Sequence, residues 1–295
     1  MKLLGKYKNG NYTVSIFDDG TKIRFTEDDE FDAAFPESFD CKICNRCNMG
    51  CPQCHEKSTC DGKLGNLDRE FIKSLRPYTE IALGGGNVLE QPDLNKFLEE
   101  LKELKVIPSM TVNQVHFEEY KNYLKALTDN ELVYGLGVSL NHVTENFIQK
   151  VKEFPNAVVH VIAGIFNEED YKRLKDRGLK VLILGYKNFG RGVNYLNDHT
   201  DVVNNNIEWL KTNISDIITH FNVVSFDNLA LKQLNIKSIL SEEEWNEFYM
   251  GNDGQHTMYV DMVEGTFAKS SISTKRYPLM DNIDEMFQII KTENK

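Results

Sequence analysis

The chain of 295 residues carries 45 acidic and 34 basic side chains, which gives a net charge of −11. This excess of acid argues against a protein whose main task is to bind nucleic acid, because phosphate contacts require Lys and Arg. Apolar residues make up 41% of the chain, enough for a sizeable core, yet the sequence contains no apolar run as long as a membrane helix, roughly 18 residues. Since no signal peptide is recognisable either, we expect a cytoplasmic protein without a membrane partner.

The N-terminal region, residues 1–36, predicts a small β-hairpin. Two segments of alternating polarity, 12–18 and 22–26, flank the tripeptide Asp19-Gly20-Thr21. Glycine supplies the positive φ that a tight turn between two strands requires.

From about residue 37 the pattern changes to strand and helix in alternation. The predicted strands are 39–44, 79–83, 107–112, 132–139, 157–163 and 180–184, and the predicted helices are 68–75, 93–104, 116–127, 143–153 and 168–176. Such alternation predicts an α/β fold with parallel strands joined by right-handed crossovers. Six units suit a (β/α)6 partial TIM-type barrel over residues 37–195, with a doubly wound sheet as the alternative that periodicity does not separate.

Residues 196–295 are less regular and predict an α+β extension. The expected elements are a helix at 199–217, a strand at 220–226, a short helix at 241–249, a hairpin of 257–263 with 266–272, and a helix at 281–291. We expect this extension to close the barrel and to shape the substrate site.

The six cysteines are the most informative feature of the sequence. All of them lie in one segment, with the spacing Cys41-x2-Cys44-x2-Cys47-x3-Cys51-x2-Cys54-x5-Cys60. A disulfide framework would spread its bridges along the chain, so the cluster indicates a metal site in a reducing compartment. Three close thiolates on a loop suit an iron–sulfur cubane. The alternative is structural zinc, which usually takes four ligands from two well-separated knuckles.

The segment Cys47-Asn48-Met49-Gly50-Cys51-Pro52-Gln53-Cys54 resembles the C-x3-C-x2-C signature of the radical S-adenosylmethionine (SAM) superfamily. The resemblance implies that Cys47, Cys51 and Cys54 bind three irons of a [4Fe–4S] cluster, whose fourth iron takes the amino and carboxylate groups of SAM. It also implies that an electron donor such as flavodoxin or ferredoxin drives cleavage of SAM to a 5′-deoxyadenosyl radical, which abstracts hydrogen from a substrate. The family usually has an aromatic residue before the third cysteine, where this chain has Gln53, and we expect the Gln53 amide to contact adenine instead.

The resemblance assigns further SAM contacts to the ends of the later strands. The run Gly84, Gly85, Gly86 and Asn87 resembles the family motif that receives the SAM amino group, although a tight turn is the simpler interpretation. Asn113, Ser139 and Asn141 follow the third and fourth strands, where relatives bind the SAM ribose and carboxylate, unless they only cap the next helices. Ile162 and Gly164 correspond to the stretch that packs on adenine, unless the fifth strand is ordinary core.

The residues that act on the substrate stay open, and Cys44, Cys60, Lys187 and Arg191 are the candidates. The two thiols could donate hydrogen, and the two cations follow the sixth strand, where they could meet a carboxylate or phosphate. The alternative for the cations is a mobile, solvated turn.

The resemblance favours a radical SAM enzyme acting on a small-molecule or peptide substrate. Three alternatives remain: an activase that places a radical on a partner protein, a zinc-stabilised binding protein without catalysis, and an iron–sulfur electron carrier that does not use SAM.

Overall fold

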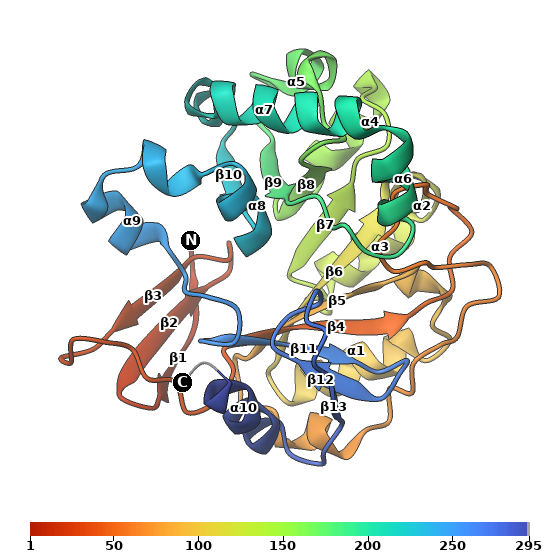
Figure 1. Cartoon of the computed structure of the whole chain (residues 1–295). Helices are drawn as coiled ribbons and strands as arrows, with labels where there is room; N and C mark the ends of the chain where they lie inside the picture. Colours follow the sequence, from red (N-terminus) through yellow and green to blue (C-terminus); the bar gives the residue numbers. More distant parts are fainter. Residues whose placement is uncertain (294–295) are drawn as a thin grey trace.

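The computed structural model describes residues 1–293 and contains two sheets. The smaller sheet is an antiparallel meander of β1 (Leu3–Asn9), β2 (Tyr12–Phe17) and β3 (Lys22–Phe25) (Figure 1). Its β2–β3 part is the predicted hairpin. The strand β1 was not predicted, because its polar and charged residues interrupt the apolar alternation that marks a half-buried strand.

The larger sheet has the strand order β10-β9-β8-β7-β6-β5-β4-β11-β12-β13. Its strands, in chain order, are β4 (Ser38–Cys44), β5 (Glu80–Gly85), β6 (Ile107–Asn113), β7 (Gly135–Ser139), β8 (Ala157–Ile162), β9 (Lys180–Leu184), β10 (Val223–Phe226), β11 (Thr257–Asp261), β12 (Thr266–Ala268) and β13 (Tyr277–Pro278). The run from β10 to β11 pairs in parallel throughout, and β12 and β13 continue it antiparallel. The prediction of a partial TIM-type β/α barrel is therefore confirmed, and the doubly wound alternative is not what the chain adopts.

The six predicted barrel strands correspond to β4–β9. The strand predicted at 220–226 and the hairpin predicted at 257–272 also join this sheet, because β10 pairs with β9 and β11 pairs with β4. The C-terminal part of the chain therefore supplies the strands that flank the barrel core on both sides (Figure 1).

Most of the chain's helices lie between the strands and cover the outer face of the barrel, but α9 (Glu242–Phe248) lies apart, on the side of the small sheet (Figure 1). The helices are α1 (Leu94–Glu103), α2 (Gln114–Glu119), α3 (Lys121–Asp129), α4 (Glu145–Lys152), α5 (Glu168–Leu174), α6 (Gly192–Asp198), α7 (Thr200–Ile217), α8 (Asn228–Gln233), α9 (Glu242–Phe248) and α10 (Ile283–Thr292). Short 3-10 turns occupy Glu70–Ser74, Val88–Glu90, Ile218–His220 and Ile236–Ile239.

Two helix predictions were wrong in detail. The helix predicted at 68–75 is only the turn Glu70–Ser74, whose first residue has no side-chain cap, and Pro77 soon follows. The helix predicted at 116–127 is split into α2 and α3 at Tyr120, whose backbone is not helical. It also starts earlier, because Asn113 accepts a hydrogen bond from the amide of Val115.

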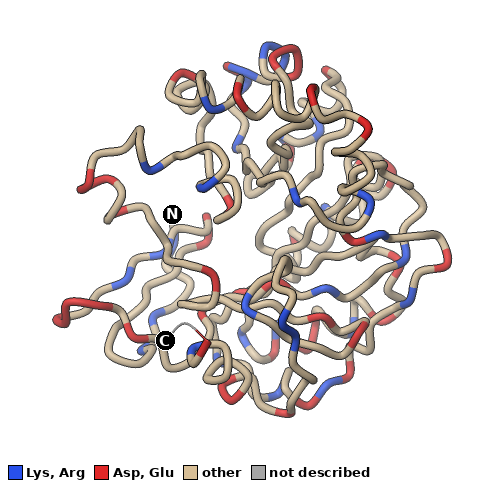
Figure 2. Tube along the Cα trace, viewed as in Figure 1, with Lys and Arg blue, Asp and Glu red and all other residues tan. Residues whose placement is uncertain are grey.

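The core lies between the sheet and its helices. Alternate strand residues such as Ile81, Leu83, Val159 and Val161 are fully buried there. The residues between them, such as His160, point to the opposite face and line the hollow of the barrel. None of the described helices is long and apolar enough to cross a membrane, and in the view of Figure 2 basic residues are interspersed with acidic ones instead of forming one basic face.

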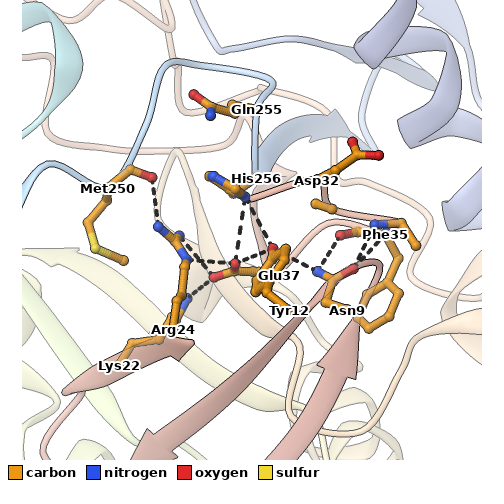
Figure 3. A network of polar contacts seen from close by, with 12 residues as sticks. Asn9, Tyr12, Lys22, Arg24, Asp32, Phe35, Glu37, Met250, Gln255 and His256 are labelled. Carbon is orange, nitrogen blue, oxygen red and sulfur yellow. Dashed lines mark hydrogen bonds and ion pairs between the residues drawn. The ribbon is translucent and has the colours of Figure 1, made fainter. Parts of the chain in front are cut away.

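The small sheet closes the amino ends of the barrel strands. The Asn156 side chain donates to the carbonyl of Asp18 in the β2–β3 turn, at 2.8 Å. A buried polar network fixes the small sheet in place: the fully buried carboxylate of Glu37 accepts from Arg24 Nε at 2.8 Å and from the Tyr12 hydroxyl at 2.6 Å (Figure 3). Its burial raises the pKa, but the charges of Lys22 and Arg24 outweigh this and lower the pKa of Glu37 to about 2. A cavity of about 280 Å³ remains between the small sheet and the amino ends of the strands, and the cysteine loop lies at the opposite end of the barrel, where the strands have their carboxyl ends.

Candidate functional site

The first barrel strand leads directly into the cysteine loop. In β4, Phe39, Cys41 and Ile43 belong to the hydrophobic core. The spacing predicts that Cys41 and Cys44 face opposite sides, but the pairing of β4 with β5 shifts between Lys42 and Cys44, and both thiols are fully buried. The Cys44 thiol also donates to the carbonyl of Arg46 at 3.3 Å, so its hydrogen is engaged by the start of the cysteine loop.

The three motif cysteines follow on a loop without regular secondary structure. Cys47, Cys51 and Cys54 are each partly exposed, and Gly50 provides a left-handed turn between the first two, with φ of 59°. Burial raises the pKa of the Cys51 thiol, and the neighbouring sulfurs of Cys54 and Cys47 raise it further. The three thiols are therefore electrostatic neighbours. Cys60 is exposed and lies close enough to raise the pKa of Cys47 as a lesser contribution after burial.

Arg191 holds the cysteine loop from the opposite side of the barrel mouth. Its Nε donates to the carbonyl of Cys51 and its Nη1 to the carbonyl of Ser58, each at 2.9 Å. Its backbone amide donates to the carbonyl of Cys54 at 3.0 Å. A substrate anion was the partner expected for this cation, whereas the observed partners are three carbonyls of the loop.

The glycine run at the carboxyl end of β5 packs against the same loop. A Cβ on Gly85 would lie 2.2 Å from the carbonyl oxygen of Cys44, and one on Gly86 would lie 2.4 Å from that of Arg46. The Gly86 amide donates to Cys44 O at 2.6 Å, and the Asn87 amide donates to Arg46 O at 2.7 Å. Close approach was expected for a ligand, but at Gly85 and Gly86 the approaching group is the protein backbone. Of the three glycines in this run, Gly84 is the one whose Cβ would face open space.

The asparagines after β6 and β7 pair with each other. Asn113 and Asn141 exchange two side-chain hydrogen bonds of 2.9 Å. Asn113 also caps α2, as the simpler interpretation predicts, while helix α4 is capped by Thr144. Ser139 lies beside Asn113 in the sheet register and is partly exposed. These strand ends thus form one polar edge at the barrel mouth.

Ile162 and Gly164, which were both assigned to the adenine contact, lie in different surroundings. Ile162 is partly exposed on the inner side of β8, whereas Gly164 is buried, and a Cβ there would lie 2.8 Å from Val203 of α7. Gly164 therefore serves close packing of this helix. Deeper in the hollow, His160 occupies the space that a side chain on Gly137 would need, and burial lowers the pKa of His160 to about 4.

Lys187 and Gln53 lie at the edge of the loop. The Lys187 ammonium donates to the Ser271 hydroxyl at 3.1 Å and lies 3.5 Å from His55 Nε2. Gln53 is partly exposed, and its carbonyl is close to Gly192. The two cations of the segment 187–192 are therefore held by partners, while Asn188 and Phe189 between them are exposed.

Sequence reasoning missed three residues that fix this loop. The Gln91 amide donates to the carbonyls of Ile43 and Gly65, which are the two ends of the loop. His116 Nε2 pairs with the Asn48 side chain at 2.7 Å. Lys42 forms an ion pair of 2.7 Å with Glu56. Only Lys42 gave a signal, since a lysine inside an apolar strand needs a buried partner.

The three motif thiols have the chemistry that binding of an iron–sulfur cluster requires. Three partly exposed thiols on one loop are the ligands that such clusters use. Within residues 1–293, however, no three His, Cys, Asp or Glu side chains are arranged so that they already hold a metal ion.

Taken together, the chain is a partial β/α barrel with a three-cysteine loop at the carboxyl end of its first core strand. No family model matches it, and no curated protein matches it. Solved structures with the same fold include those of SuiB from Streptococcus suis. The structure bound to the precursor peptide SuiA has a TM-score of 0.59 and 13% identity, with 87% of this chain and 65% of SuiB covered. The S-adenosylmethionine-bound structure has a TM-score of 0.55 and 12% identity, over 89% and 66% of the two chains. The chain thus spans just under two thirds of the length of SuiB, and the likeness at this identity is one of fold.

Proposed function

We propose that the protein is a radical SAM enzyme whose Cys47, Cys51 and Cys54 hold a [4Fe–4S] cluster. The observation that carries the proposal is the position of the cysteine loop. It follows the first core strand at the carboxyl end of a partial barrel, which is where β/α barrels place their chemistry. The S-adenosylmethionine bound to SuiB supports the same cofactor here.

The cluster would supply the single electron that splits SAM into methionine and a 5′-deoxyadenosyl radical. Around it, Arg191 fixes the loop backbone and adds a positive charge beside the thiolates. Gly84 leaves the end of β5 open for the SAM amino group. The edge formed by Asn113, Ser139 and Asn141 offers hydrogen bonds to the ribose and carboxylate.

For the substrate we propose a peptide or a small molecule that resembles part of one. The precursor peptide bound to SuiB supports this class. Hydrogen abstraction requires the substrate to lie in the hollow beside the cysteine loop, where water is partly excluded.

The test is anaerobic reconstitution of the full chain with iron and sulfide, followed by incubation with SAM and dithionite. We expect a brown protein with about four irons per chain, which forms 5′-deoxyadenosine. The single variants Cys47→Ala, Cys51→Ala and Cys54→Ala are expected to lose both the iron and the product. Cys60→Ala, which changes an exposed thiol outside the motif, is expected to retain the iron. A colourless protein with stoichiometric zinc, or iron retained by the motif variants, would contradict the proposal.

A further inference from the structure

A cavity of about 250 Å³ opens beside the cysteine loop, on the inner face of β4 and β11. Residues 55–57 of the loop form one wall, and Tyr259 and Asp261 of β11 form another. The segment 269–276, which joins β12 to β13, bounds it from outside through Ser271, Ile272 and Arg276. The cavity therefore lies next to the proposed cluster but belongs to the strands added by the C-terminal part of the chain.

Part of the charge in this cavity is already balanced. The Lys42 ammonium lies 2.7 Å from Glu56 and 3.5 Å from Asp261. Asp261 also accepts from the backbone amides of Val263 and Glu264, each at 3.0 Å. The single charge of Lys42 offsets one of the two carboxylates, and the three groups together hold the loop against the sheet.

Arg276 is held differently. Its guanidinium stacks on the Tyr259 ring, 4.7 Å from the centroid, and its Nη2 donates to the carbonyl of Ser271 at 2.7 Å. Its Nη1 is buried and has no hydrogen-bond partner within residues 1–293. A buried donor without a partner is costly, and more so when it belongs to a charged group. The side chain is thus fixed in position, with the N–H groups of Nη1 unused.

A fixed guanidinium with an unused donor matches an oxyanion ligand. Guanidinium binds carboxylate or phosphate through parallel hydrogen bonds, which is stronger and more directional than a neutral contact. The carboxylates of Glu56 and Asp261 line the same cavity, and they would repel a phosphate dianion more than a carboxylate. The volume is small, which suits the end of a chain or a side chain better than a whole peptide.

We propose that this cavity binds a carboxylate of the substrate, with Arg276 as its anchor. The role as a substrate subsite rests on the function proposed above, while the binding of carboxylate does not. The substrate class is accordingly an acidic one: a peptide or amino-acid derivative that presents a terminal or side-chain carboxylate to the cavity.

The experiment uses the full chain, with and without the reconstituted cluster, and two matched probes. N-acetylglycine carries the carboxylate, and N-acetylglycinamide has the same shape without the charge. Saturation-transfer NMR titrations are expected to show binding of the acid and at least tenfold weaker binding of the amide, roughly the worth of one charge-assisted hydrogen bond. Arg276→Gln is expected to weaken binding of the acid about tenfold or more, and Arg276→Lys is expected to weaken it less.

Lys275→Gln is the matched control, because Lys275 is exposed and pairs with Glu293. It removes a neighbouring positive charge and is expected to leave binding unchanged. Circular dichroism identifies any variant that has lost its fold, in which case Arg276→Lys carries the test. Equal binding of acid and amide, or equal binding by wild type and Arg276→Gln, would overturn the inference. These readouts do not require SAM cleavage, so their failure is distinct from an absence of 5′-deoxyadenosine.

Discussion

Replacing Arg191 with alanine should weaken the cysteine loop without touching a cysteine. The variant loses the two side-chain hydrogen bonds to the carbonyls of Cys51 and Ser58. Hydrogen bonds to charged groups contribute about 1.5–3 kcal/mol each. Because Arg191 is half-buried, the lower figure applies, and the loss is about 3 kcal/mol. The loop should then open roughly 100 times more often than in the wild type.

Iron loss to a chelator measures this opening directly. Reconstituted Arg191→Ala is expected to release iron to an excess of chelator up to about 100 times faster than the wild type under anaerobic conditions. Arg191→Lys keeps the charge but lacks the fork that spans two carbonyls, so it should lie between the two.

Arg177→Ala is the control for removal of a surface arginine. Arg177 pairs with Glu145 on the outside of the barrel, away from the loop, and exposed pairs contribute about 0–1 kcal/mol. This variant should release iron at the wild-type rate. If Arg191→Ala also releases iron at that rate, the loop does not depend on the Arg191 contacts and the reasoning is wrong.

Two further predictions concern the buried network and the glycine run. Since the pKa of Glu37 falls from 4.5 to about 2 on folding, its contribution of about 3 kcal/mol is complete above pH 4.5 and is lost as the pH falls toward 2. Burial lowers the pKa of His256 from 6.5 to about 4, so a similar amount of stability is lost as the pH falls from 6.5 to 4. Urea unfolding at a series of pH values should show both losses. If Glu37→Gln loses stability below pH 4.5 as the wild type does, the assignment to Glu37 is refuted. Gly86→Ala should lower the free energy of unfolding in urea by about 1–3 kcal/mol, because its Cβ would meet the Arg46 carbonyl. Gly84→Ala is the control, because its Cβ would face open space, and it should unfold like the wild type. Equal stability of the two variants would contradict the close packing.

The barrel core could be predicted because its signal is local. The strands β4–β9 are short apolar runs, and those from β5 to β9 are each followed by a helix; this pattern depends only on neighbours in sequence. The strands β10 and β11 were also recognisable as strands. Their parallel partners were not, because which edges they extend is decided by contacts far apart in the chain.

The same distinction applies to the site. The position of the cysteines after β4 could be read from their spacing and from the strand before them. The partners of Arg191 and Gly86 could not, because glycine and arginine suit a ligand and a backbone carbonyl equally well. The structure shows that in both residues the partner is the loop itself.

These contacts explain how a loop without regular structure can serve as a precise site. Gly86 and Gln91 from the turn after β5, His116 from α2 and Arg191 from before α6 each contact the loop's backbone or an asparagine of the loop. The thiols of the three motif cysteines take no part in these contacts. The protein therefore fixes the path of the backbone and leaves the sulfurs for a ligand. Because the loop is already ordered, the entropic cost of ligand binding is lower. It follows that changes at these positions outside the loop should loosen a bound ligand even though they remove none of its donors.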